Sequence, residues 1–555
     1  MPAASAAASS VPAAATAATP RRPAAVTSAV SYRQHHHAQQ KQQRDARCRL
    51  HRECHLHRRH SLQRGSGGSR KPIASRATSA TSPRASSSAG PESSPASSQA
   101  VARPSRTPHS GYHYPGGDGE APFFEGWYFK VTVPDAHGVP GDSFAWMYSV
   151  ENPSAPLPVE NSSASAPPPA APSAASCPGG KKGERAGGGV PCVMMQVMGP
   201  AVERQAEWGS GEGGAGGEGG ARDYVFQETA DTGRFWGERH ELALGTCFRP
   251  REGQVSPLGE VPPQEFERRV EHGFQVTPFL NQGILKDQHD GSIVRWQYEV
   301  TPIDGWGPRG GTQLSTAGWL AALPAFEPHW QVCMALGRAT GWVEWRGHRI
   351  EFTNAVTYSE KNWGGAFPLK WFWIQCNVFS RMSLGSSIAL TVAGAKRLLN
   401  LPLVANSVEE VGMVGLHWEG QFIEFVPNRG AVEWRVQPWG SWWMRAENEQ
   451  YEVTVEAHTL PGDNGTPLRA PTAEGMRIFC KDSFEGRVKV ELRQRYSGQL
   501  LLEAESTAAA VEVGGGPWWE AWKQRSRMNA AQSAVISLPL HLSSILPPSL
   551  QPPGL

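Results

Sequence analysis

Four segments of the chain gather side chains that could exchange protons or hold a cation. They lie at His109 to Lys130, Ser315 to Ala335, Tyr358 to Asn377 and Gly415 to Pro427. Each combines carboxyl or imidazole groups with several aromatic rings, a composition that strand packing alone does not require. Carboxyl and imidazole groups act as general acids and bases, and the faces of Trp and Tyr rings attract cations. We therefore look for chemistry in these segments.

The candidate groups for proton transfer are Glu125, Glu327, Glu360, His113 and His329. Each has an ordinary structural alternative. Carboxylates at strand ends commonly accept backbone N–H bonds or pair with a cation, and Glu360, next to Lys361, is the acid most open to that interpretation. A buried imidazole commonly binds a backbone carbonyl, and Trp rings fill the core of any β-barrel. The sequence alone leaves both interpretations open for each residue.

The first segment runs into a stretch in which side chains alternate with period two. One predicted strand face holds Trp127, Phe129, Val131 and Val133, and the other holds Tyr128, Lys130 and Thr132. The alternation is repeated from Phe144 to Val150, and residues 134–142 between the two stretches are rich in Gly, Pro and Asp. Alternation with period two indicates strands, and turn residues between them indicate a hairpin. We predict a β-hairpin beside the first candidate segment.

Similar alternating runs recur toward the C-terminus, at Val432 to Val436, Tyr451 to Val455 and Val488 to Leu492. Strong helical periodicity is scarce. Strands at short spacing, separated by Gly and Pro turns, are typical of sandwiches and barrels. The length of this part of the chain suffices for two such units. The pattern predicts an all-β fold with two β-barrel or sandwich domains.

Composition divides the chain. All 21 Trp lie between Trp127 and Trp522, whereas the first hundred residues consist largely of Ala, Ser, Pro, Arg, Gln and His. Two internal stretches rich in Pro, Ala, Ser, Gly and Glu have no means of forming a core. We predict a disordered leader over 1–104, a first β domain over 105–320 with low-complexity inserts at 154–189 and 203–222, a second β domain over 321–522 and a disordered tail over 523–555.

Charge separates the leader from the rest. The first hundred residues contain 15 Lys plus Arg against three acids, the basic and Ser-rich character of an organelle transit peptide. The remaining chain carries a net charge of about −10, which disfavours a nucleic-acid partner.

The Cys residues show no CxxC spacing, so neither a zinc site nor a disulfide framework is indicated. No run of 18 apolar residues occurs, and an integral membrane protein is not expected.

Six motifs between residues 109 and 522 resemble the tocopherol cyclase family in type and in order. They are HSGYH, FFEGWYFKVT, GFQVTP, TAGWLAALPAFEPHWQ, EKNWGGAFPLKWFW and VGGGPWWE. The resemblance implies a lipocalin-like fold with two β-barrel domains, which agrees with the strand pattern. It also implies an isomerase of the intramolecular lyase class, located in the chloroplast at lipid droplets called plastoglobules. Its substrates would be methylated phytyl benzoquinols, which it would convert to tocopherols, while acceptance of plastoquinol stays open.

The implied reaction requires one group that donates a proton and one that accepts a proton. An acid must protonate the side-chain alkene to a tertiary cation, and a ring hydroxyl must then add to that carbon with loss of its proton. No electrons leave, so no cofactor is expected. We place the general acid among Glu125, Glu327 and Glu360, and assign His113 or His329 to orient the quinol or accept the phenolic proton. The expected substrate contacts are Tyr112, Trp127, Tyr128, Trp330, Asn362 and Trp363, with the Trp rings facing the cation.

Two alternatives from other classes remain open on the sequence. A lipocalin-like barrel could bind a prenylquinone without transforming it, as a carrier. Paired acids with aromatic platforms also suit a carbohydrate-binding module or a glycosidase, although an organelle leader fits that class poorly. The carrier predicts quinol binding without ring closure, and the carbohydrate hypothesis predicts binding to glycans.

Overall fold

The computed structural model describes residues 107–114, 122–134, 140–152, 191–200, 224–287, 291–379, 387–401, 404–538 and 540. Within these ranges most of the regular structure is β-strand, which confirms the predicted all-β fold. The predicted leader (1–104) and both low-complexity inserts (154–189 and 203–222) lie outside the described residues. Among the helices of the described part, none is long and apolar enough to cross a membrane.

The first sheet contains eleven antiparallel strands in the order β4-β3-β2-β1-β11-β10-β9-β8-β7-β6-β5. Its strands are β1 Phe123–Pro134, β2 Pro140–Asn152, β3 Cys192–Gly199, β4 Tyr224–Asp231, β5 Phe235–Gly237, β6 Leu244–Pro250, β7 Val270–Val276, β8 Leu280–Lys286, β9 Ile293–Asp304, β10 His329–Trp345 and β11 His348–Gly364. Short helical segments interrupt or follow these strands: η2 Thr232–Arg234, α3 Pro263–Arg269, η3 Gly318–Ala322 and η4 Pro324–Phe326.

The second sheet also contains eleven strands, in the order β15-β14-β13-β12-β21-β20-β18-β17-β16-β22, with β19 paired to β20. They are β12 Lys370–Cys376, β13 Ile388–Leu401, β14 Val404–Trp418, β15 Gln421–Phe425, β16 Ala431–Val436, β17 Ser441–Glu447, β18 Tyr451–His458, β19 Thr466–Thr472, β20 Gly475–Gln494, β21 Leu500–Gly515 and β22 Trp522–Ser526. A final helix, α4 Ala530–Ile536, follows.

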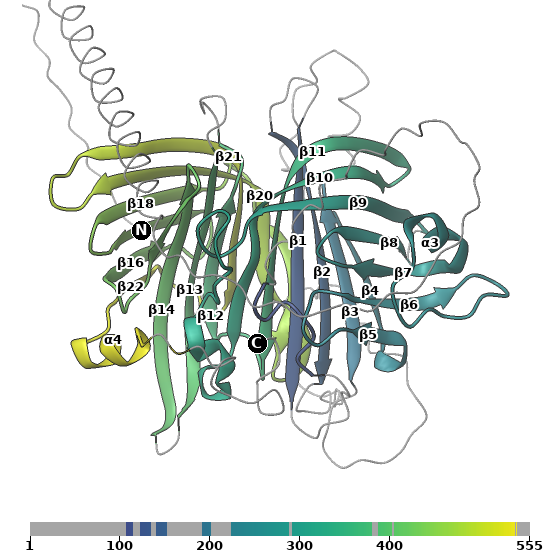
Figure 1. Ribbon diagram of the computed structural model, residues 1–555, viewed down its shortest axis with the longest axis horizontal. Helices are drawn as coiled ribbons and strands as arrows, with labels where there is room; N and C mark the ends of the chain where they lie inside the picture. Colours follow the sequence, from purple (N-terminus) through teal and green to yellow (C-terminus); the bar gives the residue numbers. More distant parts are fainter. Residues whose placement is uncertain are drawn as a thin grey trace, which may run out of the picture. The chain divides into compact units, whose positions relative to one another are not determined.

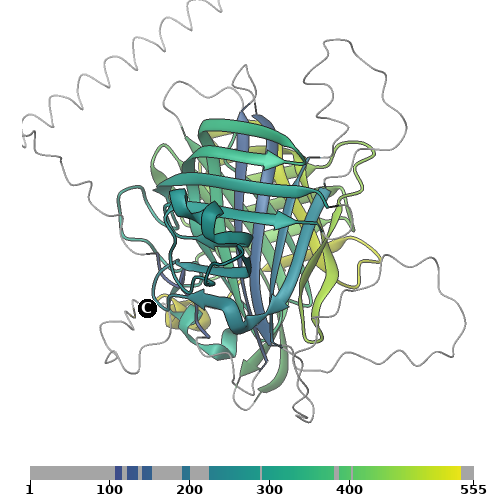
Figure 2. The same cartoon turned by 90° about the vertical axis from the view of Figure 1, so that its right-hand side faces the viewer.

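Each sheet curls around a core of its own, and the two sheets stand side by side with β1 and β20 near the middle (Figure 1). Figure 2 shows the first sheet wrapping around its interior when that half faces the viewer. Separate clusters of buried apolar side chains fill the two interiors. A third cluster lies between the sheets and combines Tyr358 and Trp373 with residues such as Met198 and Leu468.

The predicted hairpin is confirmed, and both of its faces are buried. In β1 and β2, Trp127 lies opposite Tyr148 and Val131 opposite Phe144 in an antiparallel register. The face with Trp127 and Val131 packs into the core of the first sheet. The opposite face meets the second sheet, where the buried ammonium of Lys130 donates to Gln375 Oε1 of β12 at 3.2 Å. The polar residues of this second face therefore lie between the sheets and are shielded from water.

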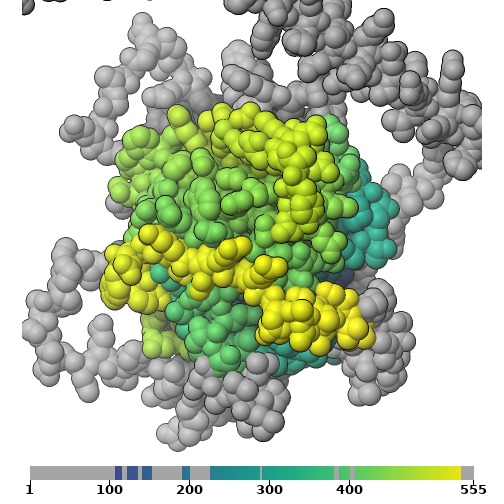
Figure 3. Space-filling model, turned by 90° about the vertical axis from the view of Figure 1, so that its left-hand side faces the viewer, coloured from purple at the N-terminus to yellow at the C-terminus, as the bar shows by residue number. Residues whose placement is uncertain are grey.

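The strand pairing differs from the predicted domain division in two places. Strands β10 and β11 pair with β9 and β1 of the first sheet, so the change of sheet falls between Gly364 and Lys370, and residue 320 marks no boundary between sheets. The segment predicted as a tail also contains regular structure within residues 523–538, because β22 pairs with β16 and α4 begins at a capping box on Asn529. Figure 3 shows this C-terminal segment, in yellow, lying across the second sheet.

Candidate active site

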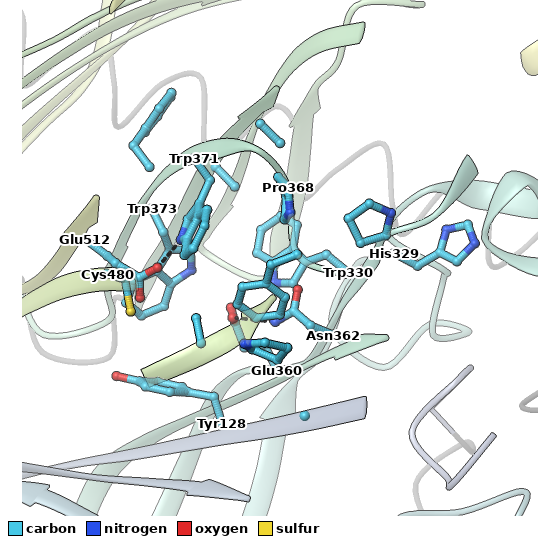
Figure 4. A pocket seen from close by; sticks show the side chains of 18 of the residues that line it. Tyr128, His329, Trp330, Glu360, Asn362, Pro368, Trp371, Trp373, Cys480 and Glu512 are labelled. Atoms are coloured by element: carbon cyan, nitrogen blue, oxygen red, sulfur yellow. Dashed lines mark hydrogen bonds between the residues drawn. The ribbon is translucent and has the colours of Figure 1, made fainter. Parts of the chain in front are cut away.

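A cavity of about 260 Å³ lies between the two sheets. Its walls come from β1, β2, β3, β10 and β11 of the first sheet and from β12, β13, β14, β19, β20 and β21 of the second. Figure 4 shows its lining, with His329 at one end, Glu512 at the other and Glu360 between them. Most of the lining is apolar or aromatic, and the few polar groups are therefore poorly hydrated.

The pairing of β1 with β11 separates the predicted residues into two groups. Glu125 lies opposite Trp363, and Trp127 opposite Lys361, on the face turned to the core of the first sheet. Tyr128 lies opposite Glu360 on the other face, which borders the cavity. Because side chains alternate along a strand, neighbouring residues in the sequence end in different environments. The motifs FFEGWYFKVT and EKNWGGAFPLKWFW, which meet where β1 pairs with β11, thus supply both a buried polar network in the core and one wall of the cavity.

Glu125 belongs to a buried polar network on the core face. Its carboxylate is fully buried, contacts the ammonium of Lys361 and lies 3.2 Å from His113 Nδ1. It also accepts the backbone N–H of His113 at 2.9 Å. Lys361 Nζ in turn donates to the carbonyls of His109 and Gly111. These contacts hold residues 109–113, which precede β1, against β11.

The charges around Glu125 decide its protonation. Burial alone would raise the pKa of this carboxyl, but the ammonium of Lys361 and the imidazole of His113 outweigh burial and hold the pKa below its usual value. The lowered pKa favours the ionised carboxylate at neutral pH and disfavours Glu125 as the proton donor. Glu125 also lies outside the cavity lining. The geometry favours a structural role for Glu125, His113 and Lys361.

Glu360, unlike Glu125, lies among neutral hydrogen-bond donors and, within the described ranges, not beside cations. Its side chain lines the cavity, with 8% of its surface exposed, and forms no ion pair among the described residues. Its carboxyl accepts the hydroxyl of Tyr358 at 2.6 Å and the amide of Asn362 at 3.4 Å. Burial raises the pKa of Glu360, and the hydrogen bond from Tyr358 offsets only part of that effect. Lys361, its neighbour in the sequence, points to the other face and pairs with Glu125 instead.

His329 presents a neutral imidazole to the cavity. Its Nε2 lies 3.1 Å from the carbonyl of Leu323, so this nitrogen carries the proton, and its Nδ1 has no hydrogen-bond partner in the described part of the chain. Burial, with help from the positive charge of Arg397, lowers the pKa of His329 to about 3. An uncharged imidazole with a free acceptor nitrogen can take up a proton.

Glu327 lies next to the cavity and fixes a loop. It follows η4, and its Oε2 accepts the backbone N–H of Gly365 at 3.0 Å. Burial raises the pKa of its carboxyl, while hydrogen bonds from Gly365 and Tyr114 partly counteract this. Pro328 lines the cavity and Glu327 does not.

The predicted substrate contacts are divided in the same way. Tyr128, Trp330 and Asn362 line the cavity. Trp127 borders it as well, but its indole packs in the core of the first sheet and donates to the carbonyl of Ser110 at 3.0 Å. Tyr112 packs in the same core, and Trp363 stacks on His109 with ring centroids 5.1 Å apart. Four of the six predicted contacts thus reach the cavity, Trp127 only at its border, and Tyr112 and Trp363 do not.

Sequence reasoning missed the contribution of the second sheet. Glu512 of β21 lines the cavity and accepts the indole N–H of Trp371, and Trp373 and Cys480 stand beside it (Figure 4). A signal for Glu512 was present, because it is the single charged residue in the run from Thr507 to Gly516. An acid at an alternating position inside an apolar strand has an unusual environment.

Known proteins similar to this chain identify its family. A family model described as "Tocopherol cyclase-like" matches residues 121–515. The chain is 43% identical over 463 residues to "Probable tocopherol cyclase, chloroplastic" of Oryza sativa subsp. japonica, covering 81% of this chain and 87% of that protein. It is equally similar to "Tocopherol cyclase, chloroplastic" of Zea mays, covering 81% of this chain and 86% of that protein. The chain belongs to the tocopherol cyclase family.

Membership in the tocopherol cyclase family confirms the resemblance found in the six motifs. It supports an enzyme, with a small lipid as substrate, and the names of both relatives agree with the expected chloroplast location. A solved structure of a protein assigned as AttH from Nitrosomonas europaea shares 12% identity with this chain at a TM-score of 0.35. That likeness covers 71% of this chain and 92% of the other and says nothing of function.

Proposed function

We propose that this protein closes the chromanol ring of methylated phytyl benzoquinols in the cavity between its two sheets, as an isomerase of the intramolecular lyase class. The observation that supports this most is Glu360, a buried carboxyl that lines the cavity without a cationic partner among the described residues. The reaction needs an acid that still holds its proton near neutral pH. Burial of Glu360 among aromatic groups supports such a proton donor.

In the proposed first step, the Glu360 carboxyl transfers its proton to the less substituted carbon of the side-chain alkene. A C–H bond forms, the alkene π bond is consumed, and a tertiary carbocation and a carboxylate remain. The indole rings of Trp330 and Trp373 line the same cavity and can stabilise the cation through their ring faces. These rings offer no strong nucleophile that would capture it.

In the second step, the quinol oxygen bonds to the cationic carbon and its proton departs to a base. His329 suits that role because its imidazole is neutral and its Nδ1 is available as an acceptor. The proton then returns to Glu360 through the product hydroxyl or water. Protons balance over the cycle, and substrate and product are isomers.

Ring closure in deuterated buffer tests this proposal. The full chain is incubated anaerobically with a reduced phytyl benzoquinol, and the chromanol is analysed by mass. We expect one solvent deuteron bound to carbon in the new ring, because the donor carboxyl exchanges with solvent before each turnover. Tight quinol binding without any chromanol would overturn the enzyme and favour a carrier.

We further propose that the protein works at the surface of plastoglobules. Three apolar side chains, Leu369, Ile478 and Phe479, are exposed next to the cavity-lining residues Pro368 and Cys480. An apolar rim next to the cavity would let a water-insoluble quinol pass from lipid to protein. The test is flotation with lipid droplets, which the double change Ile478→Ser with Phe479→Ser is expected to weaken. Undiminished flotation would contradict this surface.

A further inference from the structure

A second carboxyl, partly buried, faces the cavity, and the reaction steps above do not use it. Glu512 of β21 lines the same cavity as Glu360 of β11, so the two sheets contribute one carboxyl each. Figure 4 shows both carboxyls in the cavity, with Tyr128 beside them. Glu512 accepts the indole N–H of Trp371. Within the described part of the chain, neither carboxyl forms an ion pair with Lys, Arg or His.

The surroundings of the two carboxyls supply little positive charge. The titratable groups that face them are Tyr128 of β1, Cys333 of β10, Tyr358 of β11, and Cys480 and Asp482 of β20. Three cations approach, and each has another partner. Arg397 and Arg469 line the cavity, but Arg397 is paired with Glu409 at 2.7 Å and Arg469 donates to Gln227 at 2.7 Å. Lys130 donates to Gln375. Burial lowers the pKa of Lys130 to about 8.

Two carboxyls in one poorly hydrated cavity cannot both ionise easily. Burial, together with the negative charge of Glu360, raises the pKa of Glu512 to about 7, although the hydrogen bond from Trp371 opposes this shift. Interacting acids release their protons in two separate steps that belong to the pair. The first proton leaves readily, and the second is held to higher pH because its loss would place two negative charges together.

We propose that Glu512 is a positioning residue for the proton donor: its negative charge in the same cavity opposes ionisation of Glu360, so that the pair still holds one proton, the shared proton, at neutral pH. The inference rests on the proposed ring closure with Glu360 as donor. After proton transfer to the alkene both carboxyls are ionised, and the phenolic proton that leaves in the second step restores the shared proton. Glu512 thereby sets the upper pH limit of activity without touching the reacting carbons.

The pH dependence of kcat in Glu512→Gln tests this inference. The amide keeps the shape and an acceptor for Trp371 but removes the charge. We expect the alkaline limb of the kcat profile to move to lower pH by about one unit or more, with KM changed less than about threefold. At pH 8 this means a loss of about tenfold or more, while activity at pH 6 stays near the parent value. Glu512→Asp keeps the charge and is expected to restore the limb.

Glu424→Gln is the matched control. Glu424 is a partly buried acid of β15 that also accepts a Trp indole N–H, from Trp306 at 3.0 Å, and burial raises the pKa of its carboxyl although Arg429 lies 3.4 Å away. It does not line the cavity. We expect its pH profile to coincide with that of the parent. A general effect of losing one partly buried carboxyl would move both variants alike.

Trp371→Phe gives a test with the opposite sign and does not depend on the folding of Glu512→Gln. It removes the N–H that stabilises the Glu512 carboxylate, so the alkaline limb is expected to move to higher pH. Coinciding profiles for Glu512→Gln and the parent, with Glu360→Gln inactive, would overturn the shared proton and leave the proposed function intact. Loss of activity at every pH in a folded, quinol-binding Glu512→Gln would also overturn it, because Glu512 would then be the donor. An active Glu360→Gln would instead contradict the proposed function.

Discussion

The two faces of β1 and β11 place similar residues in opposite electrostatic settings. On the core face, Glu125 meets Lys361 and His113, and its pKa is lowered. On the cavity face, Glu360 meets Tyr358 and Asn362, and its pKa is raised. Both carboxyls are buried, and the same adjacent motifs supply them.

The difference teaches that burial alone does not make a proton donor. A buried carboxyl beside cations is ionised and holds structure, whereas one beside neutral donors keeps its proton. The ion pair on the core face is therefore expected to contribute to stability, and the carboxyl on the cavity face is expected to contribute to catalysis. Variants on the two faces should fail in different ways.

The largest effect is expected from Glu360→Gln. Removing a general acid typically costs 10²- to 10⁴-fold in rate, and we expect kcat to fall in that range while quinol affinity changes little. Steady-state kinetics and a binding titration measure the two quantities. Glu327→Gln is the matched control, since Glu327 has a raised pKa but lies outside the cavity lining, and its kcat should fall less than about tenfold. A larger loss in Glu327→Gln would move the donor to that residue.

Next in size is the loss of stability in Glu125→Gln. The change leaves the Lys361 ammonium buried without its anionic partner, and we expect the free energy of unfolding to fall by about 3–5 kcal/mol. Urea denaturation followed by Trp fluorescence measures it. The matched variant Glu360→Gln breaks no ion pair among the described residues and should lose far less. Equal losses in both variants would remove the distinction between the faces.

A smaller effect is expected from His329→Gln, which keeps a polar side chain but removes the proton acceptor. We expect kcat to fall about tenfold, the low end for a base that water can partly replace. The pKa of His329 lies at about 3, so the parent should show no acid limb near pH 6.5. The kcat profile between pH 5 and 8 checks this. A limb near pH 6.5 that disappears in His329→Gln would show that the imidazole is more basic than its burial indicates.

The smallest effects concern the pH dependence of stability, in which Glu125 of the core face and Glu512, across the cavity, are expected to act with opposite signs. The lowered pKa of Glu125 means that its stabilisation is present above the unfolded pKa near 4.5 and is lost as pH falls through the folded value. The raised pKa of Glu512, at about 7, means that its contribution is present below 4.5 and is lost as pH rises toward 7. Between pH 5 and 8, the parent should lose a few degrees of Tm relative to Glu512→Gln, measured by calorimetry. Parallel curves would contradict the raised pKa.

Much of the fold could be predicted from the sequence, and only part of the site. Period-two alternation was enough to identify the hairpin of β1 and β2, because the face with Trp127 must leave water. The same pattern could not show that the face with Tyr128 also leaves water, since that depends on a second sheet far away in the sequence. Glu512 was missed for this reason, as its partner Glu360 lies about 150 residues earlier.

The pairing of Lys361 could not be predicted for a related reason. The sequence places Glu360 next to Lys361, which suggested an ion pair, but neighbours along a strand point to opposite faces. Lys361 pairs with Glu125 across the β1 and β11 register instead. Register between distant strands decides which charges meet, and no local pattern contains that information.

The central account is tested most directly by a single turnover that compares Glu360→Gln with Glu125→Gln. Each variant is saturated with reduced quinol at low temperature, the folded fraction is determined, and chromanol is measured per folded, quinol-bound molecule after rapid quenching. The account predicts that Glu125→Gln retains the parent rate within about threefold, whereas Glu360→Gln is slower by 10²-fold or more. The opposite result would contradict this mechanism: a parent-like rate in Glu360→Gln, together with a rate slower by 10²-fold or more in folded Glu125→Gln. The proton donor would then lie on the core face.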